Sequence, residues 1–296
     1  MKHLPSNNQQ SHIKHFHVSI ATHCKYCGSE NIVRYGFQNG MQQYFCRTCN
    51  RKFAGKDTLE NKHTPTPEIG TALGMFYNGL SLSKISQQIQ AIYNDDIGPS
   101  TIYYWVKEYS CKAIDIFKRC SLNVGDIWVV DETVINICGQ NVWFWDIIDE
   151  KTRFLLASHL SKERTIADVA VVMRKALDRT GREPKYILSD SLKAYPKGIQ
   201  RIFGDRAKHV KSKGFTAEIN TNLIERFHGT VKERTKILRG FKSLETAKMI
   251  LDGFLINYNF FRPHMSLKDT TPAHEAGVKL PFDTWEGLLR ILQYGS

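Results

Sequence analysis

Short apolar runs separated by tight turns mark the middle of the chain. IWVVDE (127–132), VINIC, VWFWDIID and RFLLAS are rich in β-branched and aromatic residues, and Gly139-Gln140-Asn141 is the first clear turn signal between them. This pattern predicts an antiparallel meander of three strands. The first run is typical of a strand buried on both faces, with an acidic residue where it reaches the edge of the sheet.

The region that follows alternates helices with short strands. TIADVAVVMRKALDRTG has the helical period and ends at Gly181, and KYILSD (185–190) is a further buried strand ending in an acid. We then expect a helix around Tyr195–Phe203, a strand near Lys208–Val210 and a helix in NTNLIERFHGTVKERTKI (220–237). This is the element order of the ribonuclease H-like fold, an α/β class with a mixed sheet flanked by helices. Residues 125–262 are therefore predicted to form one such domain.

Acidic residues end two of the predicted buried strands. The first and fourth strands of this fold are neighbours, so Asp131 and Asp190 are expected to converge, and an acid from a following helix is placed to complete a site. Clustered carboxylates repel one another unless a cation neutralises them, and hard oxygen ligands suit Mg²⁺ or Mn²⁺. Glu132 and Asp146 remain alternatives, and Glu132 should point away from Asp131 if the strand continues.

Residues 67–118 have the pattern of three helices. PEIGTALGMFYNG ends at Gly79, SLSKISQQIQ begins at Ser81 or Ser83 as N-cap, and TIYYWVKEYSCKAIDIF has Ser100 as N-cap. The region is typical of a helix-turn-helix DNA-binding domain, with a plain helical bundle as the alternative because AIYNDDIGP is a long connection. If the domain binds DNA, the residues expected to face it are Ser100, Thr101, Tyr103, Tyr104 and Lys107.

Four of the seven cysteines have the spacing C-x2-C-x18-C-x2-C: Cys24, Cys27, Cys46 and Cys49. The two pairs are joined by β-prone runs around an Asn39-Gly40 turn signal, which predicts a zinc ribbon over residues 21–55. Four thiolates complete a tetrahedral site, so the zinc is expected to be structural. Residues 1–20 are predicted as a polar flexible arm, 56–66 as a linker and 263–296 as a C-terminal tail.

The charge of the chain favours a polyanionic partner. Lys and Arg number 41 and Asp and Glu 29, a formal net charge of +12, which suits nucleic acid or an anionic membrane surface. Nothing in the first 30 residues resembles a signal peptide, and no apolar run approaches the ~20 residues that span a bilayer. Seven cysteines without a secretory signal argue against a disulfide framework. We expect an intracellular protein with reduced thiols and no membrane partner.

Basic residues follow Glu225 along one side of the predicted helix 220–237. His228, Lys232 and Lys236 lie three, seven and eleven positions after it and form one stripe. The stripe is either a solvated face or a track for DNA phosphates leading to the metal site. The buried stripe is expected to contain Leu223, Ile224, Phe227, Val231 and Leu238.

Several motifs together resemble a known family. VVDET, ILSDS, NLIERFHGTVKERTK, LRGFKS and NYNFFRPHMSL are similar to prokaryotic insertion-sequence transposases of the Asp-Asp-Glu type, and the nearest group is the insertion-sequence-six family in a version with an N-terminal zinc ribbon. The resemblance covers about residues 67–278 and includes the long connection in the helix-turn-helix segment. The 34 residues between Asp190 and Glu225 also fit this family.

The resemblance implies a mechanism and partners. Asp131, Asp190 and Glu225 would be the catalytic triad that binds divalent metal, with Asp131 bridging two ions. The family cuts element ends to free 3′-hydroxyls and joins them to target DNA by transesterification. The implied partners are double-stranded DNA, as terminal repeats and as target, and further copies of the chain, at least a dimer. The implied location is the cytoplasm, on the nucleoid.

Two other functions remain open. A transposon-derived regulator would bind DNA without catalysis, but it would have no reason to keep the three acids. A nuclease of the same fold would hydrolyse DNA without strand transfer, but two N-terminal recognition modules are unusual for such an enzyme. The zinc ribbon has several candidate roles: end recognition, target contact and dimer assembly. Arg262 and His264 could touch DNA, although packing of Tyr258 and Phe260 is the favoured purpose of their motif.

Overall fold

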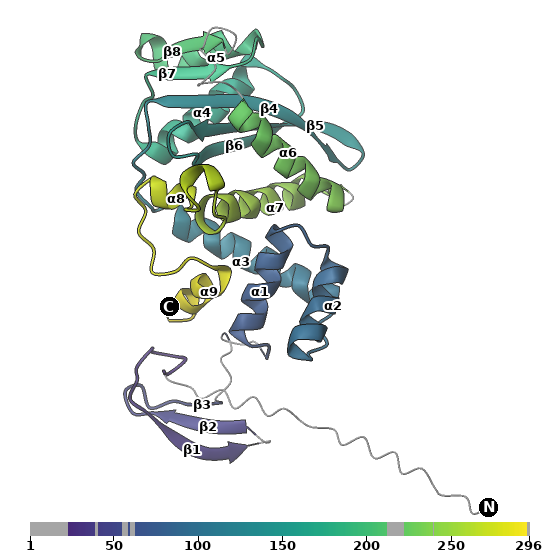
Figure 1. The fold of residues 1–296 in the computed structure, drawn as a ribbon, viewed down its shortest axis with the longest axis vertical. Helices are drawn as coiled ribbons and strands as arrows, with labels where there is room; N and C mark the ends of the chain where they lie inside the picture. The colour runs from purple at the N-terminus through teal and green to yellow at the C-terminus, as the bar shows by residue number, and fades with distance from the viewer. Residues whose placement is uncertain are drawn as a thin grey trace, which may run out of the picture. The chain divides into compact units, whose positions relative to one another are not determined.

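The computed structural model describes residues 23–38, 41–54, 59, 63–211, 222–238 and 240–294 (Figure 1). The chain divides into two compact units, Met1–Pro65 with Leu292–Ser296, and Thr66–Ile291. The predicted arm 1–20, the Asn39-Gly40 turn and most of the linker 56–66 lie outside the described residues. No helix in the described ranges is long and apolar enough to cross a membrane.

The smaller unit is a three-stranded antiparallel sheet. Its strands are β1 (Ile32–Gln38), β2 (Met41–Cys46) and β3 (Lys52–Ala54), in that order. Tyr44 stacks on Phe53 with ring centroids 5.7 Å apart, and Tyr26 meets the same ring edge-on at 6.3 Å. These aromatic rings pack around the buried sulfur-bearing side chains of Cys24 and Cys46.

Three helices begin the larger unit: α1 (Thr66–Tyr77), α2 (Leu82–Tyr93) and α3 (Pro99–Phe117). Ser81 caps α2, because its side chain accepts a hydrogen bond from the Lys84 backbone N–H. The prediction that Ser100 caps α3 is wrong. Gly98 is the N-cap and Pro99 the first helical residue, since proline has no N–H to satisfy and its φ suits that position.

A five-stranded mixed sheet forms the centre of the larger unit. Its strands are β4 (Ile127–Ile137), β5 (Gln140–Asp149), β6 (Leu155–Ser161), β7 (Tyr186–Ser189) and β8 (Lys208–Lys211), in the order β6-β5-β4-β7-β8. β4, β5 and β6 form the antiparallel meander, whereas β7 and β8 run parallel to β4. The first and fourth strands of the domain are neighbours, which confirms the predicted ribonuclease H-like arrangement.

The first strand is longer than the sequence pattern predicts. IWVVDE and VINI belong to one strand of 11 residues, so Asp131 lies in its middle and not at its end. The cause is the pairing with β5, which continues from Trp128 opposite Asp149 to Ile137 opposite Gln140. The turn follows at Cys138 and Gly139, both with positive φ.

The remaining helices cover this sheet and extend the unit. α4 (Ile166–Thr180) packs on α5 (Ala194–Phe203) and on β6, and α6 (Asn222–Ile237) crosses β4 and β5 (Figure 1). α7 (Leu244–Ile256) packs on α3, and the short turn η1 (Gly204–Arg206) follows α5. The segment predicted as a tail contains further helical elements, because its apolar side chains pack: Trp285 is buried and stacks on Tyr77. These elements are η3 (Asn257–Phe261), η4 (Met265–Leu267), α8 (Pro272–Glu275) and α9 (Trp285–Tyr294).

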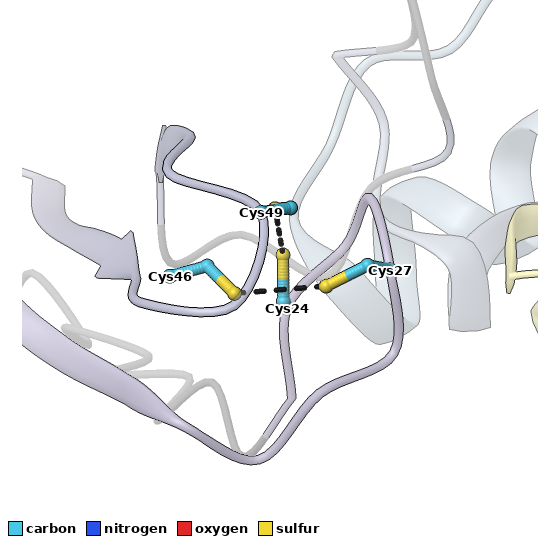
Figure 2. A group of neighbouring side chains, drawn as sticks. All are labelled: Cys24, Cys27, Cys46 and Cys49. Carbon is cyan, nitrogen blue, oxygen red and sulfur yellow. Dashed lines mark hydrogen bonds between the residues drawn. The ribbon is translucent and has the colours of Figure 1, made fainter.

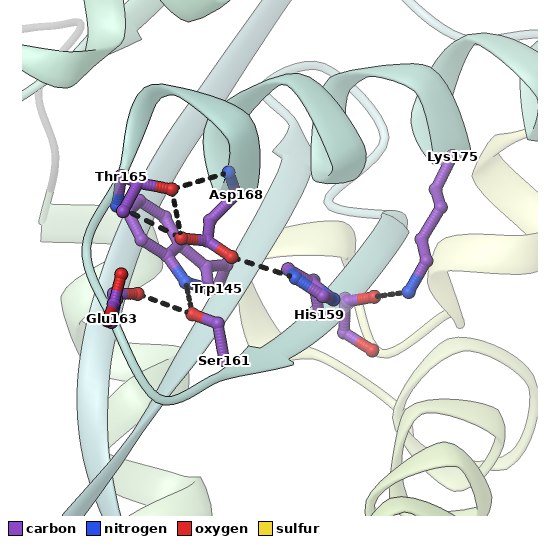
Figure 3. Close-up of polar contacts among 8 residues, drawn as sticks. Trp145, His159, Ser161, Glu163, Thr165, Asp168 and Lys175 are labelled. Atoms are coloured by element: carbon purple, nitrogen blue, oxygen red, sulfur yellow. Dashed lines mark hydrogen bonds and ion pairs between the residues drawn. The ribbon is translucent and has the colours of Figure 1, made fainter.

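A capping box fixes the start of α4 against the sheet (Figure 3). The Thr165 hydroxyl accepts from the Asp168 backbone N–H at 3.3 Å, and Asp168 Oδ2 accepts from the Thr165 N–H at 3.0 Å. The other oxygen of Asp168 lies 3.3 Å from His159 Nε2 on β6. The box therefore also fixes the short connection from β6 to α4, which contains Arg164.

We expect Thr165→Ala to lower the free energy of unfolding by about 1 kcal/mol, because one helix N–H loses its acceptor. Asp178→Ala on the same helix is the matched control, since Asp178 is exposed and lies outside the box. Urea unfolding followed by tryptophan fluorescence measures both, and Trp145, which pairs with His159 across the β5–β6 strands, should report the change. Equal stability of the two variants would show that the box contributes nothing.

Candidate active site

Two aspartates meet where the parallel pair of strands ends. The last β4–β7 pair is Val129 with Leu188, and Asp131 and Asp190 each lie two residues beyond it. One carboxylate oxygen from each of Asp131, Asp190 and Glu132 lies within 4.8 Å of the other two. The sequence-based expectation that Asp131 and Asp190 converge agrees with this geometry.

Glu132 belongs to the cluster but is held by other side chains. Its Oε1 accepts from Arg164 and its Oε2 from the Tyr195 hydroxyl on α5. Burial raises the pKa of Glu132, while Tyr195 and Arg164 act in the opposite direction. Its neighbour Asp131 contacts α6 instead, so the two carboxylates have different partners although their oxygens are close.

Asp131 and Asp190 have the better geometry for holding a cation. Among the described contacts, Asp131 uses Oδ2 toward His228, and Asp190 uses Oδ1 to accept from the Leu192 backbone N–H at 2.9 Å. One oxygen of each therefore remains for a ligand, whereas both oxygens of Glu132 are engaged. Hard oxygen donors of this kind fit a divalent cation such as Mg²⁺.

His228 lies in the interior and not on an exposed basic stripe. Its Nδ1 is 3.4 Å from Asp131 Oδ2 and its Nε2 is 3.2 Å from Asp146 Oδ2, and the residue is 4% exposed. The prediction that it faces DNA with Lys232 and Lys236 is therefore wrong. The helical spacing explains this burial. His228 lies four positions after Ile224, which is fully buried, and residues four apart lie on the same side of a helix.

Asp146 faces Asp131 directly across the β4–β5 pairing and is fully buried. Burial raises the pKa of Asp146 to about 6, although its hydrogen bond with His228 acts to lower it. Burial alone would lower the pKa of His228, but its hydrogen bonds to Asp131 and Asp146 raise it to about 9. The His228 ring therefore lies between two acidic side chains, and its contacts with them favour its protonated form.

Glu225 is exposed in the first turn of α6, one turn before His228. It is not among the carboxylates that lie within 4.8 Å of one another in the described residues. The predicted buried stripe of α6 has its centre at Ile224, Phe227 and Val231, all buried, while Leu223 and Leu238 are half-buried. α6 also buries Arg234, whose guanidinium lies 4.2 Å from the Phe76 ring centroid.

The other candidate DNA contacts differ in exposure. At the start of α3, Tyr103 is half-buried, and the exposed candidates are Ser100, Thr101, Tyr104 and Lys107. Tyr104 is the most open of these aromatic side chains, at 67%. On α6, Lys232 and Lys236 are exposed.

Sequence reasoning missed Arg164 and Tyr195. Neither lies in one of the motifs quoted above, and only the packing of the β6–α4 connection and α5 brings them to Glu132. The local sequence contains no signal for these contacts.

In the smaller unit the four predicted cysteines converge (Figure 2). Cys24 Sγ lies 3.6 Å from Cys49 Sγ, and Cys27 Sγ lies 3.6 Å from Cys46 Sγ. Four sulfurs bound at about 2.3 Å to one tetrahedral ion would be about 3.8 Å apart, so the spacing fits zinc. Gly28 and Asn50, which follow the two Cys-x2-Cys turns, both have positive φ, and Ser29 and Thr48 join the turns by a 2.7 Å hydrogen bond.

Comparisons with known proteins agree with this arrangement. A family model described as a DDE domain matches residues 125–264. The transposase for insertion sequence-like element IS431mec of Staphylococcus aureus is 25% identical over 224 residues, 74% of this chain and 95% of the relative. The transposase for insertion sequence element IS257 in transposon Tn4003, also from Staphylococcus aureus, is 25% identical over 217 residues, 72% of this chain and 93% of the relative.

Solved structures with partial similarity include two integrase catalytic core domains. That of HTLV-2 integrase in complex with magnesium, in its dimeric form, is 17% identical, with 51% of this chain and 94% of that chain covered and a TM-score of 0.40. That of BIV integrase is 17% identical, with 51% and 93% covered and a TM-score of 0.40.

The matched DDE domain contains the sheet, both converging aspartates and α6 with Glu225. The aligned insertion-sequence transposases extend this match to about three quarters of the chain. The chain therefore contains a region that matches a DDE domain, and over about three quarters of its length it is similar to transposases of insertion sequences.

Proposed function

We propose that Asp131, Asp190 and Glu225 hold the divalent cations with which this transposase cleaves the ends of its element and joins the freed 3′-hydroxyls to target DNA. The observation that carries the proposal is the convergence of Asp131 and Asp190 beyond the β4–β7 pair, with one oxygen of each available. Asp131 and Asp190 come from separate parts of the chain and meet just beyond the last β4–β7 pair.

Glu225 is proposed as the third ligand because of its place on α6. His228 attaches this helix to Asp131, and Glu225 lies three residues earlier, on the same side and about one turn nearer the start of the helix. The exposure of Glu225 suits a ligand that meets both metal and DNA.

The chemistry divides between the cations and the chain. Bound divalent cations activate the attacking oxygen and stabilise the leaving oxygen of an in-line displacement at phosphorus. Asp131, Asp190 and Glu225 hold them, and Tyr195 and Arg164 keep Glu132 in place beside them. No side-chain nucleophile is needed. All the donors are carboxylate oxygens, which suit Mg²⁺ or Mn²⁺.

DNA is proposed to contact two exposed surfaces. One is the start of α3, where a helix-turn-helix domain would present Ser100, Thr101, Tyr104 and Lys107. The other is the α6 side that carries Lys232 and Lys236, seven and eleven residues after Glu225. The net charge of +12 supports a phosphate-rich partner.

The zinc ribbon, the assembly and the location complete the proposal. Cys24, Cys27, Cys46 and Cys49 would hold one structural Zn²⁺, because four thiolates leave no open position for a substrate. Two element ends must be brought together, so at least a dimer would act on DNA. The site of action would be the cytoplasm, on the nucleoid, where the target DNA lies.

Glu225→Gln should lower Mg²⁺-dependent cleavage and strand transfer by about 100-fold or more, since the side chain loses its charge but keeps its size. Glu233→Gln is the control, because Glu233 is exposed on the same helix two turns away. The assay uses DNA with the element's own ends, and DNA affinity is measured beside it. Full activity of Glu225→Gln would refute the assignment, whereas wild-type DNA binding without any product would favour a regulator.

Lys232→Gln and Lys236→Gln should each reduce the slope of log affinity against log salt by about 1, since each removes one phosphate contact. Lys197→Gln provides the comparison, because Lys197 is an exposed lysine on α5. Fluorescence anisotropy over a series of salt concentrations measures the slopes. Identical slopes for all three variants and the wild type would exclude the α6 surface as a phosphate track.

Purified protein should contain about one equivalent of zinc, and Cys27→Ser should lose most of it because three thiolates hold the ion more weakly. Cys111→Ser is the control, since Cys111 is exposed on α3 and remote in sequence from the cluster. Elemental analysis measures the metal. Less than about half an equivalent in fresh wild-type protein would count against the ribbon.

A further inference from the structure

We propose that His228 and Asp146 are a pair of positioning residues that orient Asp131 and fix α6 so that Glu225 faces the metal site. The inference rests on the proposed roles of Asp131 and Glu225 as metal ligands. It assigns a purpose to His228 and Asp146, two buried residues that are not themselves proposed as ligands.

The geometry of the three side chains is the first support. The imidazole ring lies between the two carboxylates, with Nδ1 3.4 Å from Asp131 Oδ2 and Nε2 3.2 Å from Asp146 Oδ2. One ring can reach both because Asp131 and Asp146 are direct partners in the β4–β5 pairing. The contact therefore joins three elements, β4, β5 and α6, at one point.

The burial of Asp146 is the second support. It is 0% exposed, and its Oδ1 has no hydrogen-bond partner among the described residues. A carboxylate in such a place lowers stability unless it is paired, and an apolar side chain of similar size would fit at less cost. His228 is the described partner that pairs with it, so the acid is best explained by what it does to the histidine.

The two contacts also define what the ring can do. Nε2 forms a hydrogen bond with Asp146, and Nδ1 lies 3.4 Å from Asp131 Oδ2, so both ring nitrogens face a carboxyl group. A ring engaged at both nitrogens has no position left for a metal ion, and its burial keeps it from DNA. Its remaining role is to hold what it touches: it engages Oδ2 of Asp131, which leaves Oδ1 for the cation.

The same contact sets the rotation of α6. Ile224, Phe227 and Val231 bury the helix face, but apolar contacts are non-directional and tolerate small rotations and shifts. The hydrogen bond from His228 to Asp146 and its ion pair with Asp131 restrict both, and Glu225 lies only one turn away. A misplacement of about 1 Å at a catalytic ligand can reduce the rate about 100-fold.

The test compares Asp146→Leu with Asp146→Asn. Leucine keeps the volume but has no acceptor for His228, whereas the asparagine amide keeps an oxygen at the same place. Thermal unfolding, DNA affinity and strand transfer at saturating Mg²⁺ are measured for both. We expect Asp146→Leu to fold and bind DNA normally but to transfer strands at least about 10-fold more slowly, with Asp146→Asn at least about fivefold faster than Asp146→Leu.

A purely structural role would give a different result, because a leucine that packs well would leave the rate unchanged. Wild-type strand transfer by a folded Asp146→Leu protein would therefore overturn the inference. If Asp146→Leu does not fold, the double variant His228→Gln with Asp146→Asn replaces the ion pair by a neutral amide pair. It should again be at least about 10-fold slower, and a wild-type rate would again overturn the inference.

Glu225→Gln measured in parallel distinguishes a failure of the proposed metal site from a failure of the proposed positioning role. If Glu225→Gln is inactive and Asp146→Leu is fully active, only the positioning role fails. If Glu225→Gln is active, the metal site itself is wrongly assigned, whatever the Asp146 variants show.

Discussion

The site depends on a difference in length between two neighbouring strands. β4 has 11 residues and β7 has four, and they pair only from Ile127 to Val129 on the β4 side. Where β7 ends, its chain turns toward α5 and Asp190 leaves the sheet, while β4 continues along β5. Asp131 is thus held by a rigid central strand and Asp190 by a loop that begins at the same level. Convergence follows from this geometry without any special local sequence.

Bringing acids together has an electrostatic cost, and the structure meets it separately for each one. Glu132 receives Arg164 and Tyr195, Asp146 receives His228, and Asp190 receives a backbone N–H. Asp131 shares His228 with Asp146. The compensation is incomplete for Asp131 and Asp190, whose remaining oxygens favour a divalent cation. Glu132, with both carboxylate oxygens bonded, directly follows Asp131, which has one contacted oxygen, and this difference supports the proposed division between a supporting acid and a metal ligand.

The four cysteines of the smaller unit present the same kind of constraint with different chemistry. Among the described residues, the buried core of this unit contains Tyr44, Phe53, Cys24 and Cys46. A unit with so small a core would gain much of its stability from the proposed zinc ion. The positive φ at Gly28 and Asn50 lets each Cys-x2-Cys segment turn back toward the other. Local backbone geometry and the proposed ligand set therefore support one another.

Local spacing in the sequence was enough for much of this molecule. The cysteine pairs, the Ser81 cap, the order of strands and helices, and the acids Asp131 and Asp190 all follow from patterns within a few residues of each other. Such patterns do not tell where a strand ends when its partner continues, so β4 was predicted too short. They also do not tell which edge of a helix meets a buried acid, so His228 was placed with the exposed lysines. Only tertiary structure decided that His228 lies between Asp131 and Asp146 and that Tyr195 reaches Glu132. The reason is that these partners are 63 to 97 residues apart in the chain and meet only through the sheet pairing and the packing of α5 and α6.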